Sequence, residues 1–122
     1  MAKILIVDDS EVIRNLLTDF LADLGHTVDC AIDGQEGIDK ALSNEYAVVI
    51  CDVHMPKKNG FLVFTEISAK KPETEFVMTD SLPGDLAAQA QAAGVQHLLA
   101  KPFDLDQLQD TLERVLRPVQ ES

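Results

Sequence analysis

Apolar residues along this chain fall into short continuous runs that alternate with longer stretches of helical spacing. The runs at 3–7 and 46–51 are almost wholly apolar and rich in β-branched residues, a pattern that favours strands buried on both faces. Three further runs predict shorter or weaker strands. In chain order, the predicted strands cover residues 3–7, 27–31, 46–51, 75–78 and 95–100.

The stretches between these runs predict helices. From residue 11 to 24, apolar side chains recur three and four positions apart, so they form one stripe along a helix that Ser10 can cap and Gly25 can end. The predicted helices cover residues 11–24, 35–43, 61–70, 85–93 and 104–116. Strict alternation of apolar strands with helices predicts an α/β fold, in which helices cover both faces of a parallel sheet.

The length of 122 residues suits one domain with one core. We expect that domain to span residues 1–122, with 3–116 as its core and 117–122 as a tail or the start of a linker. Cys30 and Cys51 both lie in apolar stretches, where an unpaired cysteine behaves as a small buried apolar residue. We therefore expect no disulfide.

Acidic residues dominate the charge of the chain, since 21 Asp and Glu against 10 Lys and Arg give a formal net charge of −11. Such a surface repels phosphate backbones and anionic lipids, so nucleic acids and membranes are poor partners, whereas divalent cations and basic protein faces are suitable ones. The apolar runs are far shorter than the ~20 residues that span a bilayer. Asp8 and Asp9 also interrupt the first run too early for a signal peptide. These features predict a soluble, cytoplasmic protein.

Polar side chains gather where the predicted strands end. Asp8 and Asp9 follow the first strand, Asp52 ends the third, Thr79 follows the fourth and Lys101 follows the fifth. Because ligands bind an open parallel sheet beyond the carboxyl ends of its strands, we expect these side chains to meet at one edge. Any one of them alone is more typical of a cap, a turn or the surface, and it is their regular placement that favours a site.

The chemistry of this set points to phosphoryl transfer. Three neighbouring carboxylates repel one another, and a hard cation with oxygen ligands, Mg²⁺ or Mn²⁺, relieves that repulsion. The cation can also neutralise an incoming phosphoryl group, which one carboxylate can attack to form an acyl phosphate. Lys101 would balance the remaining charge, and Thr79 could donate a hydrogen bond to a phosphoryl oxygen.

Two other phosphate-handling sites fit less well. A glycine-rich phosphate loop or a hydroxyl-rich flavin-phosphate loop would follow the first strand, where Asp8 and Asp9 would instead repel a phosphate. A haloacid-dehalogenase-like phosphatase carries Asp-x-Asp after its first strand, whereas here Asp52 is followed by Val53 and His54. Both are weaker interpretations than an aspartyl phosphate.

Four segments together resemble a known family. They are Ile4-Leu-Ile-Val-Asp-Asp-Ser10, Asp52-Val-His-Met-Pro-Lys-Lys-Asn-Gly60, Thr79 and Lys101-Pro-Phe103. In this order and at these spacings they are similar to the CheY-like receiver domain of response regulators in two-component signal transduction, over essentially the whole chain. The resemblance implies a flavodoxin-like (βα)5 sandwich with a parallel five-stranded sheet of order 2-1-3-4-5.

The resemblance also implies roles for the acidic residues. Asp52 would be the phosphoacceptor for a sensor histidine kinase or a phosphotransfer protein. Asp9 would bind Mg²⁺ directly, Asp8 would help, often through water, and the backbone carbonyl of His54 would join Asp52 in the ligand set. The domain would not be an enzyme, because it would assist only its own phosphorylation and dephosphorylation. The alternative is a degenerate receiver that binds a partner protein independently of phosphorylation.

The same resemblance implies the parts of a switch. Lys101 would contact the phosphoryl group and precede Pro102 in a cis bond, Thr79 would be the switch hydroxyl, and Gly60 would free the loop beside the site. The helix after Asp9 would dock the kinase. The last strand and the helices on either side of it would face an output protein or a fused output domain. The sequence leaves open whether the chain acts alone or as a module of a longer protein.

Several positions depart from the family pattern. Leu98 stands where the family usually carries Tyr or Phe, so coupling from Thr79 to the output face would be weak or would use the backbone alone. Asp80 stands where a small residue is usual: pointing inward, it would slow phosphoryl entry or tighten the need for metal, and pointing outward it would be solvated. His54 and Ser81 occupy positions that tune phosphoryl lifetime, and neither has the acidic or amide side chain that best positions an attacking water.

Overall fold

The computed structural model describes residues 2–80 and 84–116. In these residues five strands and five helices alternate along the chain. The strands are β1 (Lys3–Val7), β2 (Thr27–Ala31), β3 (Val48–Asp52), β4 (Glu75–Asp80) and β5 (Leu98–Ala100). The helices are α1 (Glu11–Asp23), α2 (Gly34–Ser43), α3 (Gly60–Lys70), α4 (Asp85–Ala93) and α5 (Leu105–Leu116).

The strands form one parallel sheet in the order β2-β1-β3-β4-β5, which confirms the predicted flavodoxin-like fold. From β1 the chain moves outward to β2 and then crosses to β3 on the other side of β1. The strand order therefore reverses at β1. At such a reversal neighbouring loops diverge, and ligands bind in the crevice beyond the carboxyl ends of the strands, here those of β1 and β3.

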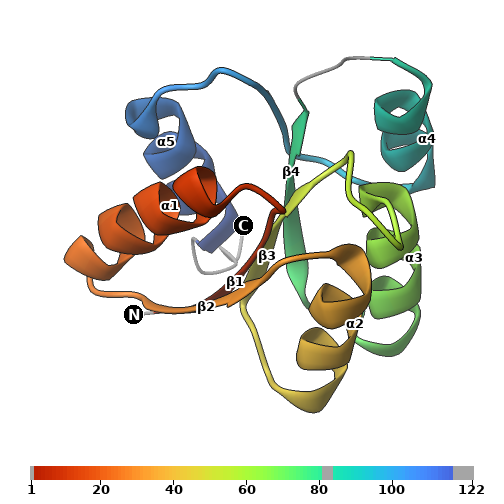
Figure 1. Ribbon diagram of the computed structural model, residues 1–122, viewed down its shortest axis with the longest axis horizontal. Coiled ribbons are helices and arrows are strands. Elements are labelled where there is room, and N and C mark those ends of the chain that lie inside the picture. The colour runs from red at the N-terminus through yellow and green to blue at the C-terminus, as the bar shows by residue number, and fades with distance from the viewer. Residues whose placement is uncertain (1, 81–83, 117–122) are drawn as a thin grey trace, which may run out of the picture.

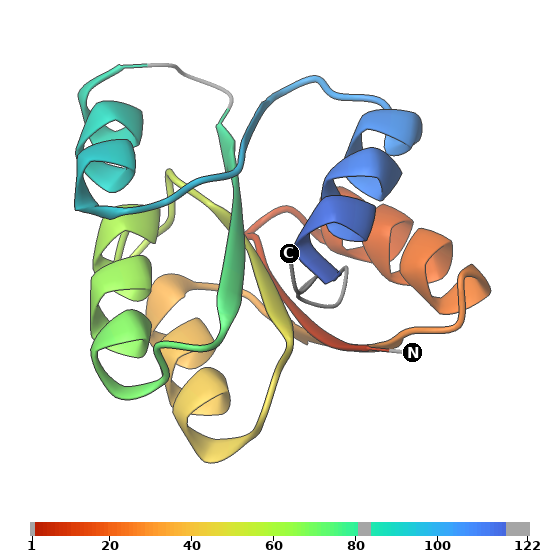
Figure 2. The ribbon, with the colours of Figure 1, turned by 180° about the vertical axis from the view of Figure 1, so that it is seen from behind.

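Helices cover both faces of the sheet, with α1 and α5 on one face and α2, α3 and α4 on the other (Figures 1 and 2). Because successive side chains of a strand point to opposite faces, each inner strand contributes to two cores. Toward α1 and α5 the buried strand residues are Ile4, Ile6, Val48, Ile50 and Val77.

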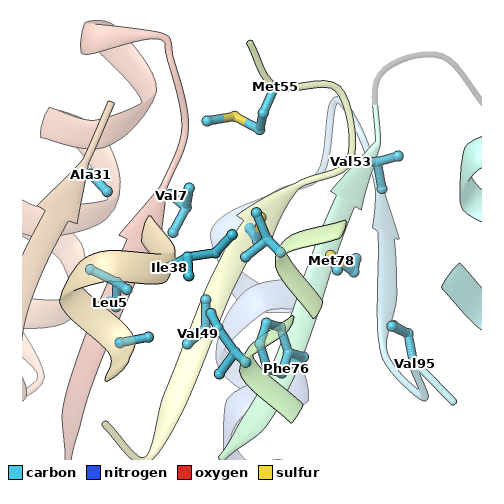
Figure 3. Packing of buried hydrophobic residues seen from close by; sticks show 14 of the residues in the cluster. Leu5, Val7, Ala31, Ile38, Val49, Val53, Met55, Phe76, Met78 and Val95 are labelled. Carbon is cyan, nitrogen blue, oxygen red and sulfur yellow. The ribbon is translucent and has the colours of Figure 1, made fainter. Parts of the chain in front are cut away.

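Alternate residues of the same strands fill the core toward α2, α3 and α4 (Figure 3). They include Leu5, Val7, Val49, Phe76 and Met78. Phe76 also meets Phe64 of α3 edge to face, with ring centroids 5.1 Å apart. Since the inner strands are packed on both faces, their carboxyl ends are held at fixed positions, and so are the polar residues found there.

β3 begins later than the sequence predicted, at Val48 instead of residue 46. Tyr46 is buried before the strand starts, and its hydroxyl donates to Asp29 Oδ2 on β2 at 2.6 Å. The Tyr46 ring therefore belongs to the core but not to the regular ladder. Hydropathy alone does not distinguish a buried residue within a strand from a buried residue just before it.

The last two strands also differ from their predicted ranges. β4 continues through Thr79 to Asp80, because Thr79 pairs with residues of both neighbouring strands although it is polar. β5 lacks residues 95–97. The N–H of Val95 donates to the Ala90 carbonyl at 3.0 Å, so this apolar residue closes the end of α4.

Other predictions fall partly outside the described residues. The role of Ser81 and the nature of 117–122 stay predictions, because the structure does not describe them. Cys51 is buried, Cys30 is partly buried, and both are free thiols. In the ranges 2–80 and 84–116, no helix is long and apolar enough to cross a membrane.

Candidate functional site

Three carboxylates meet at the carboxyl edge of the sheet. Asp8 and Asp9 follow β1 and Asp52 ends β3, and one oxygen atom from each lies within 4.8 Å of the other two. Asp8 and Asp52 are buried, whereas Asp9 is exposed. The cluster thus lies at the strand reversal and has one side open to solvent.

Lys101 reaches the cluster from the segment after β5. Its Nζ donates to Asp8 Oδ2 at 2.9 Å and to Asp52 Oδ2 at 3.1 Å. Burial of the ammonium by itself lowers the pKa of Lys101, but the hydrogen bonds to the two carboxylates outweigh it and hold this pKa above its ordinary value. The bond from Lys101 to Pro102 is cis, as predicted. The cluster therefore contains three carboxylates and one firmly protonated ammonium.

Both carboxylate oxygens of Asp52 accept hydrogen bonds. Oδ1 accepts from the backbone N–H of His54 at 3.0 Å, and Oδ2 accepts from Lys101. Burial raises the pKa of Asp52 above its ordinary value, because the two hydrogen bonds offset the loss of hydration only in part and the nearby charge of Asp8 adds to it. A further cation beside Asp52 would favour its ionised form.

Asp8 links the site to the start of α1. Its Oδ1 accepts from the Ser10 N–H and its carbonyl accepts from Arg14 Nη1, both at 2.8 Å. Ser10 caps α1 by accepting from the Ile13 N–H at 3.3 Å, as its place in the sequence predicted. The first helix is therefore tied to the acidic cluster by direct contacts.

Thr79 lies beside Asp52 on the neighbouring strand. The two residues are paired in the β3–β4 ladder, and the Thr79 carbonyl accepts from the Val53 N–H at 2.8 Å. Asp52 lies two residues after Ile50, and Thr79 lies two residues after Val77, so their side chains point toward the same face as these two, the face that α1 and α5 cover. The structure thus brings together all five side chains that the sequence singled out.

Gly60 is required for a reason other than the predicted loop freedom. It is the first residue of α3, and a Cβ atom there would lie 2.7 Å from both the carbonyl oxygen of Asp52 and the Cα of Val53. Its N–H also donates to the Val53 carbonyl at 2.7 Å. Glycine is needed because the start of α3 passes directly against the backbone of the acidic site.

The donor set fits a magnesium ion. Ionised carboxylates offer only acceptor oxygens, and Mg²⁺ prefers a few such oxygens while it keeps several waters. The buried pair Asp8 and Asp52 supplies oxygens within reach of one another, and exposed Asp9 leaves the solvent side for water. The arrangement can hold a hard cation and present Asp52 to an incoming electrophile.

Comparison with known families agrees with this geometry. The family model of the response regulator receiver domain matches residues 4–113. The chain belongs to this family. Its members are phosphorylation-controlled switches of two-component signalling and not enzymes in the ordinary sense, and they typically bind Mg²⁺ at an acidic cluster.

Individual relatives support the same assignment. Transcriptional regulatory protein RprY of Bacteroides fragilis is 31% identical over 119 residues, which are 96% of this chain and 50% of that protein. Chemotaxis protein CheY4 of Vibrio cholerae has a TM-score of 0.86 at 36% identity, covering 95% of this chain and 99% of that one. Response regulator TrrA of Thermotoga maritima, solved in complex with Mg²⁺ and BeF, has a TM-score of 0.87 at 31% identity, covering 95% and 100%.

The receiver matches only part of longer relatives. It spans 27% to 52% of the length of curated relatives such as RprY, ZraR and CiaR. By contrast, it spans nearly the whole of the CheY4 and TrrA chains. The shared part is therefore the receiver fold itself, and activities of the longer relatives do not transfer with it.

One contact in this receiver was not predicted. Asp80 is buried, with 1% of its surface exposed, and its Oδ1 lies 2.9 Å from Nε2 of His54. Neither predicted alternative holds in full: Asp80 is not solvated, and strand alternation points it away from the face of Asp52 and Thr79. The sequence signal was a His two residues after Asp52 and an Asp after Thr79, but it needs the register of β3 against β4 to be recognised.

Leu98 is an ordinary strand residue here. It opens β5 opposite Met78 and packs against the core toward α2, α3 and α4. Its aliphatic side chain fills this position but has no hydroxyl group that could form different hydrogen bonds in two rotamers. A hydrogen-bonding side chain at residue 98 therefore does not couple Thr79 to the output face.

Proposed function

We propose that Asp52 accepts a phosphoryl group from the phosphohistidine of a sensor histidine kinase or a phosphotransfer protein. The observation that carries the proposal is the buried Asp52 carboxylate, which lies within 4.8 Å of oxygens of Asp8 and Asp9 and is hydrogen bonded to Lys101. An oxygen of Asp52 forms a bond to phosphorus while the bond from phosphorus to the imidazole nitrogen breaks, and that nitrogen keeps the electron pair.

The other site residues stabilise the charge that arrives. We assign Asp8, Asp9, Asp52 and the backbone carbonyl of His54 as ligands of Mg²⁺, with Mn²⁺ as a second suitable ion. A bound ion would neutralise charge on the phosphoryl oxygens. Lys101 already lies between two carboxylates, so a small shift lets its ammonium donate to the phosphoryl group. In this way the receiver assists its own phosphorylation and dephosphorylation.

Phosphorylation would change the balance of charge next to two strands that lead to the output face. Thr79 is paired with Asp52 in the ladder, and Lys101 donates a hydrogen bond directly to Asp52. Movement of these two side chains toward a phosphoryl group would bias the ends of β4 and β5 between two arrangements. Partners that bind one arrangement better are then selected by phosphorylation. We propose the face of α4, β5 and α5 as the output surface.

The surface beside the site offers a place for the phosphodonor protein. On α1, Val12 is 75% and Leu16 47% exposed although both are apolar. A groove of about 750 Å³ separates α1 from residues 101–105, and apolar side chains such as Leu16 and Phe103 line it. Because Lys101 lines this groove and also contacts Asp52, a helix docked there would bring its histidine near Asp52.

The cellular context follows from the same proposal. A receiver of this kind acts in the cytoplasm, where it passes the signal to an output protein or to an output domain in the same chain. Curated relatives such as RprY extend well beyond the receiver, which supports the second arrangement, whereas the CheY4 chain is almost entirely receiver, which supports the first.

The test is intact-mass spectrometry after incubation with acetyl phosphate. We expect one phosphoryl group on the wild-type chain in Mg²⁺ and also in Mn²⁺, and none in EDTA. Asp52→Asn should lose it. Asp110→Asn is the matched control, because Asp110 is exposed on α5 and its substitution removes the same charge elsewhere.

Each result bears on the proposal. Phosphorylation of Asp52→Asn would assign the acceptor to another residue. Phosphorylation in EDTA would contradict the role of the metal. Failure of the wild-type chain under every condition would overturn the proposal in favour of a degenerate receiver that binds its partner without phosphorylation.

A further inference from the structure

His54 connects two strands through two different parts of the same residue. Its side chain contacts β4, with Nε2 2.9 Å from Asp80 Oδ1. Its backbone N–H donates to Asp52 Oδ1 at the end of β3, at 3.0 Å. Since an ionised carboxylate only accepts hydrogen bonds, Nε2 is the donor in the first contact. The orientation of residue 54 is therefore set from both sides.

Asp80 is a fixed point in this arrangement. Only 2% of its side chain is exposed, against 33% for the imidazole of His54. Its backbone carbonyl accepts from the Lys101 N–H at 2.8 Å, so it is also part of the ladder to the segment that delivers Lys101. A carboxylate held this firmly can restrain the more exposed imidazole that reaches it.

The backbone on both sides of His54 is tied to the rest of the molecule. Val53 is tied to the sheet through its N–H to the Thr79 carbonyl and through its own carbonyl to the Gly60 N–H. After residue 54, Met55 is buried in the core toward α2, α3 and α4, and the Pro56 carbonyl accepts from the Gly34 N–H at 3.3 Å. The chain then reaches exposed Lys57, which has a φ of 69°. The contact between the imidazole and Asp80 adds a restraint through the side chain of residue 54 itself.

We propose that Asp80 is a positioning residue of this receiver, which acts through His54 to fix the backbone of residue 54 after the acceptor strand. The inference rests on the proposed function, because residue 54 carries the carbonyl assigned to the metal. Asp80 thereby raises affinity for Mg²⁺ and speeds phosphoryl transfer, in contrast to the slowing that an inward-pointing Asp80 would cause. The charge on Asp80 is not needed for this role; the hydrogen bond to His54 is.

The first measurement is Mg²⁺ affinity of the unphosphorylated protein by isothermal titration calorimetry. Removing a residue that orients a metal ligand weakens binding by about tenfold at the lower end of the usual range, and we expect that loss in Asp80→Ala. Asp80→Asn keeps an acceptor for His54 Nε2 and should bind Mg²⁺ like the wild type. Glu45→Ala is the control for charge. Glu45 is exposed and pairs with Lys71 at a distance of 2.7 Å, and this pair is not part of the site.

The second measurement is the phosphorylation rate with acetyl phosphate over a range of Mg²⁺ concentrations. Asp80→Ala should be slow at low Mg²⁺ and should recover at high Mg²⁺, because the acceptor itself is intact. Hydrogen exchange of the His54 amide should be faster in Asp80→Ala than in Asp80→Asn. If Asp80 had only a structural role, Asp80→Ala would lower the free energy of unfolding in urea, and its phosphorylation rate would not recover at high Mg²⁺.

Clear outcomes overturn the inference. Wild-type Mg²⁺ affinity in Asp80→Ala would do so, as would an Asp80→Asn variant that is as weak as Asp80→Ala. Faster phosphorylation of Asp80→Ala would favour simple repulsion by Asp80. If Asp80→Ala does not fold, His54→Ala and His54→Gln replace it, because the Gln amide can still donate to Asp80 and should preserve Mg²⁺ affinity. If the wild-type chain takes no phosphoryl group but the Mg²⁺ results hold, only the proposed function fails.

Discussion

Lys101 is the residue on which the charge balance of the site depends. Its side chain is only 15% exposed, and it lies between two carboxylates that are themselves almost completely buried. Buried charges of one sign are tolerated when an opposite charge contacts them directly. The stability of the metal-free receiver should therefore depend strongly on this one ammonium.

We expect Lys101→Ala to lower the free energy of unfolding in EDTA by about 3 kcal/mol, because removing one partner of a buried ion pair leaves the other charges uncompensated. The loss should be smaller in saturating Mg²⁺, since the cation takes over part of the neutralisation. Urea unfolding followed by circular dichroism measures both values.

Lys58→Ala is the control for this prediction. Lys58 pairs at 2.8 Å with Glu66, and the two side chains are 34% and 41% exposed; such surface pairs contribute less than about 1 kcal/mol. An equal loss for both variants, or no effect of Mg²⁺ on Lys101→Ala, would contradict the role of Lys101 in charge balance.

At the scale of elements, side chains cap most of the helices. The residues that accept a hydrogen bond from the first turn are Ser10 for α1, Asp33 for α2, Asn59 for α3 and Asp104 for α5. Asp104 also receives a reciprocal bond, because its N–H donates to Gln107 Oε1 at 3.0 Å, the arrangement known as a capping box. These short-range contacts fix where each helix begins.

Two of these caps differ in charge and should therefore differ in their response to acid. The N–H of Glu36 donates to Asp33 Oδ1 at 2.8 Å and holds the pKa of Asp33 below its usual range. Because the folded-state pKa is lowered, this cap stabilises the protein fully above the unfolded-state pKa, near 3.9, and its contribution falls as pH drops through the lower folded-state value. Asn59, which caps α3, has no charge to lose.

We expect Asp33→Ala to cost about 1 kcal/mol at pH 7 and clearly less at pH 3, whereas Asn59→Ala should cost about the same amount at both values. Urea unfolding of each variant against wild type at the two pH values measures this. A cost for Asp33→Ala that does not change with pH would show that the ionised carboxylate is not what caps α2.

α4 is the exception among the helices. Its N-cap residue, Gly84, provides no side-chain hydrogen bond, and among the side chains of α4 that the structure describes only Ala90 is buried. α3, by contrast, has a side-chain cap at Asn59 and buries Val63 and Ile67. Few buried contacts and a missing cap lower the free energy of local opening.

Native-state hydrogen exchange should therefore show faster exchange in residues 88–93 of α4 than in the central turns of α3. The two helices serve as internal controls for each other, since they lie side by side in one protein under one set of conditions. Equal protection in α3 and α4 would contradict a weakly held α4 and would weaken its assignment to the output surface.

At the scale of the whole molecule, acidic charge dominates. The formal net charge is −11, and three carboxylates meet at one edge of the sheet. Repulsion between like charges destabilises a compact state, and an ion that binds only the folded chain offsets it by mass action. Mg²⁺ should therefore stabilise this receiver through the site and not only through general screening.

The expected gain is about 2.7 kcal/mol in the free energy of unfolding at a Mg²⁺ concentration 100 times the Kd. Thermal unfolding in MgCl2 against NaCl of equal ionic strength separates binding from screening. Asp9→Asn should lose most of the gain, because it removes the exposed ligand of the cluster. The same gain in Asp9→Asn as in wild type would place the stabilising Mg²⁺ elsewhere.

Local sequence patterns were sufficient to predict the order of elements, the fold class and the residues at the strand ends, because hydropathy period, helix caps and polar residues after apolar runs are local properties. Ser10 capped its helix as predicted. The three carboxylates also met as expected, since parallel strands carry their carboxyl ends to one edge.

Contacts across the sheet could not be predicted from these local patterns. The burial of Asp80 against His54, the placing of Val95 at the end of α4 and the need for glycine at position 60 all depend on which strands are neighbours and in what register. A local pattern contains no information on register or on how closely two backbones approach. For that reason the site residues could be found from the sequence, whereas the contact that orients His54 could not.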